Sequence, residues 1–122
     1  MKKYRVVKIE PNKPAYETFI EDGLKPLQEA VEGYIEITYP FDEDVYLVGN
    51  DEAKLIGLKG NRRIGGVIYA GNLLIVGDDG EGGSRDLTDD EVKKFVEMFK
   101  EPENIDDDEV QNDVGFTVIG WY

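Results

Sequence analysis

The fold is decided between residues 27 and 62, which read LQEAVEGYIEITYPFDEDVYLVGNDEAKLIGLKGNR. The stretch opens within a short helix expected over residues 24–32, in which Pro26 suits a first-turn position. The apolar residues of this helix share one face: Leu24, Leu27, Ala30 and Val31. Gly33 follows where a left-handed C-terminal cap is wanted. Because the helix is only about two turns long, we expect packing on a sheet to hold it.

Strand-like runs surround this helix. Residues 34–39 alternate between apolar and polar types and form the clearest strand, and residues 45–48 are expected to pair antiparallel with it. Residues 73–76 are continuously apolar, as in a central strand buried on both faces. Residues 59–63, in contrast, indicate a polar loop. Further strands are expected at residues 4–10, 16–21 and 67–69.

A second helix is predicted over residues 87–100. Thr88 and Glu91 have the spacing of a capping box, and Leu87 with Val92 has that of a hydrophobic staple. Short strands interrupted by only two helices predict an α+β fold, with a mixed, mainly antiparallel sheet and both helices packed on it.

The chain divides at residue 102 by composition. Residues 1–102 are expected to form one α+β domain, as the length of 122 residues also favours. Residues 103–113 contain so many acids that we expect a connector that does not pack. Residues 115–121 are apolar and alternating, and either return as an edge strand or stay loose.

Histidine and cysteine are both absent, which removes the commonest general base, thiolate metal sites and disulfides. We therefore expect no catalytic residue, no metal site and no cofactor. The acidic loop at residues 78–84 has clustered oxygens, but its spacing is not that of an EF-hand. No run of apolar residues is long enough for a membrane span, so a cytoplasmic location and no membrane contact are expected.

The formal net charge is −13, from 27 acidic and 14 basic residues. Such acidity repels phosphate, so direct nucleic-acid binding is not expected. The charge is unevenly distributed, because one internal block has bases and no acid. This block holds Lys54, Lys59, Arg62 and Arg63.

The motifs of this chain resemble those of an uncharacterised bacterial domain family, classed as a domain of unknown function and found in bacterial, phage and mobile-element genomes. The resemblance spans roughly residues 4–100 and includes Leu27-Gln28, Gly33 to Glu36, Asn50 to Lys54, Asn61-Arg62, Ile75 to Gly77, and Leu87 to Asp89. The family usually has two glycines before its Tyr-Ile-Glu, and the first of these is Glu32 here. The resemblance implies no activity and no catalytic residue.

Two polar segments are the candidate binding site. The first carries Asn50, Glu52 and Lys54, and the second carries Asn61 and Arg62. If the two segments converge, their amide and guanidinium donors suit a carboxylate, a phosphate or a protein backbone. The competing interpretation is a surface in which arginines only neutralise neighbouring acids.

Three classes of function remain open. The first is a non-catalytic binding module for an unknown protein partner or a small anionic ligand. The second is an acidic decoy that imitates DNA and occupies a nucleic-acid-binding host protein. The third is an enzyme built on carboxylate, Lys or Tyr chemistry, which no paired-carboxylate motif favours. The basic block at residues 54–63 argues against a uniformly acidic decoy, so we expect the binding module.

Overall fold

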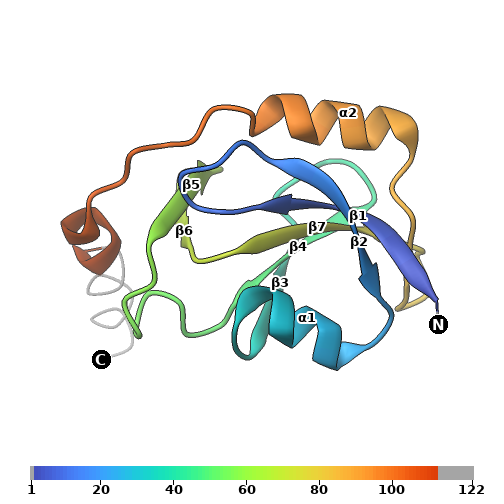
Figure 1. Ribbon diagram of the computed structural model, residues 1–122, viewed down its shortest axis with the longest axis horizontal. Helices are drawn as coiled ribbons and strands as arrows, with labels where there is room; N and C mark the ends of the chain where they lie inside the picture. The colour runs from blue at the N-terminus through green and yellow to red at the C-terminus, as the bar shows by residue number, and fades with distance from the viewer. Residues whose placement is uncertain (1, 113–122) are drawn as a thin grey trace.

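The computed structural model describes residues 2–112 and shows one main sheet with a helix on each face (Figure 1). Its strand order is β2-β1-β7-β4-β3, with the short β8 paired to β7, and every pairing among the described residues is antiparallel. The strands are β1 (Lys3–Ile9), β2 (Tyr16–Glu21), β3 (Ile35–Thr38), β4 (Val45–Asn50), β7 (Leu73–Asp78) and β8 (Ser84–Arg85). The predicted α+β class is confirmed.

A separate antiparallel hairpin, β5 (Gly60–Ile64) with β6 (Val67–Ala70), lies beside one face of this sheet. The helices are α1 (Leu24–Val31) and α2 (Asp89–Met98), and a further helical turn covers residues 107–112. None of these helices is long and apolar enough to cross a membrane.

The central strand is β7, as its apolar run predicts. It pairs with β1 on one side and β4 on the other, and residues 73–77 are buried. Alternate side chains point to opposite faces of the sheet, so Leu73 and Ile75 enter one core while Leu74 and Val76 enter the other.

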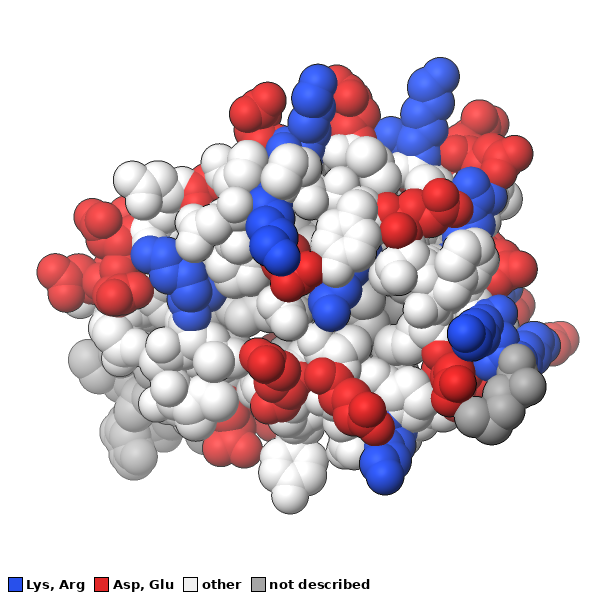
Figure 2. All heavy atoms as spheres, in the orientation of Figure 1, with Lys and Arg blue, Asp and Glu red and all other residues white. Residues whose placement is uncertain are grey.

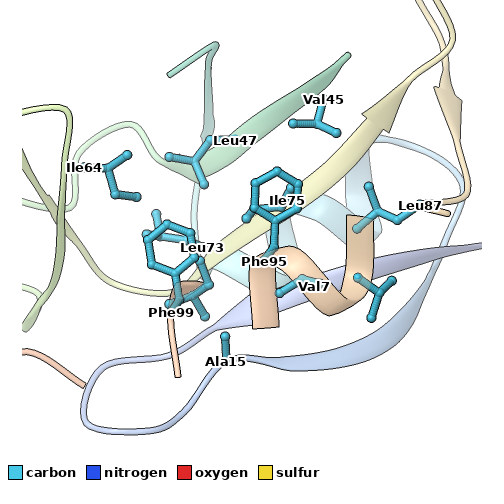
Figure 3. Close-up of a cluster of buried hydrophobic side chains, with 12 residues drawn as sticks. Val7, Ala15, Val45, Leu47, Ile64, Leu73, Ile75, Leu87, Phe95 and Phe99 are labelled. Atoms are coloured by element: carbon cyan, nitrogen blue, oxygen red, sulfur yellow. The ribbon is translucent and has the colours of Figure 1, made fainter. Parts of the chain in front are cut away.

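The helices close these two cores. Val31 of α1 packs on the face that carries Leu74, together with Tyr46 and Val48. On the opposite face, Phe95 of α2 and the adjacent Phe99 lie over Leu47, Leu73 and Ile75 (Figure 3). The residue Ile64 brings hairpin β5–β6 into this second core.

The predicted capping box of α2 is confirmed. Thr88 is the N-cap, its hydroxyl accepts from the Glu91 N–H at 3.1 Å, and the Glu91 carboxylate accepts from the Thr88 N–H at 2.9 Å. The helix ends at Met98, two residues earlier than predicted.

Two local predictions are wrong. Residues 59–63 are not a loop, because residues 60–64 form β5. The left-handed residue after α1 is Glu32, with φ of 64°, and not Gly33. Glycine is required at position 33 for a steric reason instead. A Cβ at this position would lie 2.6 Å from Asn50 Nδ2 and would clash with it.

The expectation that residues 103–112 do not pack is also wrong. Ile105 and Val110 are fully buried against Ala53 and Ala70. The acids of this segment face outward, while its two apolar residues lie close to the backbone of Gly60, where a Cβ would meet both at 3.0 Å. The strand predicted at residues 115–121 falls outside the described part of the chain.

Candidate functional site

The predicted site residues Asn61 and Arg62 are buried inside the protein. Their side chains are 0% and 1% exposed, although they are consecutive in a strand. Consecutive residues normally face opposite sides, but the register of β5 with β6 shifts between Gly60 and Arg62. This bulge adds one residue to β5 and lets both polar side chains point inward.

The Arg62 guanidinium forms hydrogen bonds with oxygen atoms of three segments. Its Nη2 donates to the carbonyls of Lys13 at 2.7 Å and Phe99 at 2.9 Å, and its Nη1 donates to Asn61 Oδ1 at 2.8 Å. Burial lowers the pKa of Arg62, and the Glu103 charge opposes this effect. Since Phe99 is the C-cap of α2, Arg62 places a positive charge at the negative end of that helix dipole.

The Asn61 side chain extends this network to the main sheet. Its Nδ2 donates to the carbonyls of Ile9 and Gly71, both at 2.8 Å. Asn61 therefore joins the end of β1 to the turn between β6 and β7. The Asn61 amide and the Arg62 Nη atoms, expected to donate to an anion, are used internally, whereas Nε of Arg62 has no hydrogen-bond partner among the described residues.

Asn50 has a comparable role on the other face. Its Nδ2 donates to the carbonyls of Val31 at 3.1 Å and Glu32 at 3.3 Å, and its Oδ1 accepts from the Glu52 N–H at 2.8 Å. Asn72, which the sequence did not single out, donates to the Ala30 carbonyl at 3.2 Å. Together the two asparagines bind the last carbonyls of α1, which have no partner within the helix.

The other two predicted residues differ in position. The side chain of Glu52 is exposed, whereas Lys54 is half-buried and lines a pocket that Asn50 also lines. Arg62 lines a different hollow, on the far side of the hairpin. The two predicted segments therefore do not converge on one ligand site. Arg63, next to Arg62, points outward and forms ion pairs with Glu103 and Glu109.

The pocket beside Asn50 has a volume of about 650 Å³ and lies between the β3–β4 edge and hairpin β5–β6. Small residues leave this space open, namely Gly49, Ala53 and Ala70. Its apolar wall is completed by Leu55, Val67, Ile68, Tyr69 and Leu73. The Thr38 and Tyr69 hydroxyls, 3.3 Å apart, bridge the sheet and the hairpin at this wall.

The charged groups of the pocket are Glu36, Asp51 and Lys54. The Glu36 side chain is exposed, but desolvation by the surrounding atoms raises its pKa, the Asp51 charge raises it further, and the Lys54 charge lowers it by a smaller amount. Within the described residues, the Glu36 carboxylate has no hydrogen bond or ion pair. The pocket therefore presents an exposed carboxylate without a direct partner among the described residues, beside an apolar wall.

The sequence analysis missed this pocket. Glu36 was noted as a polar position of a strand and as part of a motif shared with the family, but not as a pocket residue. The space in the pocket depends on the small side chains that line it. One local signal was available, since Gly49 interrupts an otherwise apolar strand, and glycine within a strand often marks a close approach of a ligand or another backbone.

Charge on the surface is mixed. On the face shown in Figure 2, basic and acidic side chains alternate instead of separating into areas of one sign. Several of the basic residues are paired with acids, including Arg5 with Glu17 and Asp89, and Arg85 with Glu91. This arrangement on the visible face differs from the continuous acidic surface that a DNA-imitating decoy requires.

Comparison with known proteins identifies the family but no activity. Residues 1–100 match the family described as Domain of unknown function (DUF3846), and the chain belongs to this family. The match ends two residues after α2 and leaves out the segment that carries Ile105 and Val110. No curated protein and no solved structure matches the chain.

Proposed function

We propose that this member of the family is a non-catalytic binding module whose ligand places a positively charged group in the pocket between the β3–β4 edge and the β5–β6 hairpin. The observation that supports this most directly is Glu36, an unpaired carboxylate whose pKa is raised by desolvation and by Asp51. A cation placed near these two acids would favour the ionised carboxylate of Glu36 and so oppose both effects.

The pocket also favours a ligand with an apolar portion. Its floor is made of Gly49, Ala53, Ala70 and Leu73, and its volume accommodates a side chain or a small molecule. A small anionic ligand, the alternative from the sequence, was expected to use the guanidinium of Arg62 among its donors. Its Nη donors already bind carbonyls, so the cationic ligand has the better support.

Nuclear magnetic resonance titration with Nα-acetyl-lysine amide tests this proposal. We expect the backbone amide signals of Gly49, Ala53 and Ala70 to shift with the lysine derivative and to shift little with the neutral analogue Nα-acetyl-norleucine amide. Glu36→Gln should remove most of the response. Glu52→Gln is the matched control, because it removes the same charge from a residue that is also exposed but does not line the pocket.

The pH dependence gives a second readout. Binding needs the ionised form of Glu36, so affinity should fall as the pH decreases through the raised pKa of this group. The loss should therefore begin at a higher pH than for an ordinary glutamate. Equal shifts with the neutral analogue, or an unchanged response in Glu36→Gln, would contradict the proposal.

A further inference from the structure

We infer that the ligand is an extended peptide segment of a partner protein, which adds to the sheet at the free edge of β3 and inserts a basic side chain into the pocket. This inference rests on the proposed function, because it assigns the partner of the same site. Three features of β3 support this inference: its unpaired backbone groups, its exposed apolar side, and the carboxylate of Glu36.

The unpaired backbone groups follow from the register. Asp51 N–H donates to the Tyr34 carbonyl at 2.8 Å, in register with the pairs Ile35↔Asn50 and Ile37↔Val48. Hydrogen-bonded and non-hydrogen-bonded pairs alternate in an antiparallel ladder, so the N–H and C=O groups of Ile35 and Ile37 point away from β4. Among the described residues, β3 pairs with no other strand.

The two sides of β3 differ chemically. Ile35, Ile37 and Tyr39 occupy alternate positions on the side that faces away from the pocket, and Ile37 and Tyr39 are 43% and 67% exposed. Glu36 and Thr38 project to the opposite side and line the pocket. An exposed edge strand is normally protected against pairing by charge, proline or a cover. Here the exposed apolar side chains make the edge suitable for a partner.

This geometry specifies the pattern of the partner. A residue opposite Ile37 directs its side chain to the same face as Ile37, where an apolar side chain would contact Ile37 and Tyr39. Its neighbours direct theirs to the pocket face, where a Lys or Arg would reach Glu36 and Asp51. The partner segment is therefore extended, with apolar and basic residues in alternation, and backbone hydrogen bonds supply affinity independent of its sequence.

The opposite edge of the sheet has a smaller pocket. Strand β2 also has one unpaired side, and Phe19 on it is 60% exposed. However, the Glu17 carboxylate is already paired with Arg5. A second pocket of about 520 Å³ lies beside β2 and is lined by Glu21 and Glu29. The β3 edge differs by its larger pocket and by the Asp51 charge beside Glu36.

The peptide acetyl-Val-Lys-Val-Lys-Val-amide is a suitable probe. We expect it to bind at least about tenfold more tightly than Nα-acetyl-lysine amide, because it adds backbone hydrogen bonds to the single basic group. Binding should slow hydrogen exchange at the Ile35 and Ile37 amides. The same peptide N-methylated at its valines keeps its charge but cannot donate to β3, and should lose about tenfold in affinity.

A variant tests the same hydrogen bonds from the protein side. Ile37→Pro removes an N–H that points away from β4, so pairing with β4 is preserved, while Ile37→Val is the matched control that keeps the N–H. Ile37→Pro should weaken peptide binding and leave binding of the lysine derivative unchanged. If the proline variant does not fold, the N-methylated peptide still decides the matter on the unaltered protein.

The outcomes separate the two proposals. If the lysine derivative binds but the N-methylated and unmodified peptides bind equally, the pocket stands and strand addition is wrong. If neither the lysine derivative nor the peptide binds, both proposals fail. If a peptide of the same composition and scrambled order, acetyl-Lys-Lys-Val-Val-Val-amide, binds as tightly as the alternating one, attraction to the acidic protein explains binding and the inference is overturned.

Discussion

The two helices cover opposite faces of one sheet, but their ends are held in different ways. At its N-terminus, α2 has a complete capping box, whereas α1 begins at Gly23 without a side-chain cap. At their C-termini the helices are alike in one respect, since a buried polar side chain from a strand binds the last carbonyls of each. Arg62 does so for α2 and Asn50 for α1.

This comparison explains residues that seemed to belong to a ligand site. Asn50 and Arg62 are polar and lie close to glycines in the sequence, as ligand-binding residues often do. In the folded protein they satisfy helix carbonyls that would otherwise be buried without a partner. Amide and guanidinium donors suit a backbone carbonyl as well as an external ligand, so residue type alone cannot separate the two roles.

The largest effect is expected at the C-terminus of α2. Arg62→Ala should reduce the free energy of unfolding by about 3 kcal/mol or more, because it removes the donors of three main-chain carbonyls and leaves a cavity. Thermal unfolding should then occur about 10 °C lower. Arg63→Ala is the control, with an expected loss under about 1 kcal/mol for exposed ion pairs. Equal losses in both variants would show that Arg62 does not hold the helix end.

Asn50→Ala tests the corresponding position on α1. It should cost about 2 kcal/mol, since it leaves the Val31 and Glu32 carbonyls and the Glu52 N–H without their partner. Native-state hydrogen exchange should accelerate in α1 and remain slow in α2. Asn72→Ala, which removes a single bond to α1, should have about half the effect. Acceleration in α2 as well would mean that the two helices are not held independently.

The N-terminal difference between the helices predicts a smaller effect. Thr88→Ala should cost about 1 kcal/mol, because the Glu91 N–H loses its acceptor. Chemical denaturation of the variant and the parent measures this difference. No corresponding substitution can be made at the N-terminus of α1, because its N-cap residue Gly23 has no side chain that accepts a hydrogen bond. A change under about 0.3 kcal/mol would show that the capping box contributes little here.

The smallest expected effect has the opposite sign. Glu32 adopts the left-handed conformation, which a residue with a Cβ disfavours, so Glu32→Gly should stabilise the protein by about 0.5 kcal/mol. The gain should appear as slower hydrogen exchange at the end of α1. Glu29→Gly, within the same helix, is the control and should destabilise. A loss of stability in Glu32→Gly would show that the Glu32 side chain makes a compensating contribution.

Much of the fold could be predicted because local patterns report it directly. The alternation of residues 16–21, the apolar run that became β7, and the spacing of Thr88 with Glu91 each depend on neighbours within a few residues. The strand β5 could not be predicted, because its residues are polar and its inward positions are filled by Asn61 and Arg62. Polarity indicates a loop only where no buried partner is available for the polar groups.

The sequence by itself determined the α+β class, the central strand, the cap of α2 and the absence of cysteine and histidine chemistry. Only the tertiary structure decided what the polar motifs bind, because the carbonyls of Lys13 and Phe99 reach Arg62 from segments far away in the chain. The same holds for the pocket at Glu36. The pocket exists because small side chains of β4, the following turn and β6 lie next to one another in the folded protein. No local sequence pattern predicts that these three segments are neighbours.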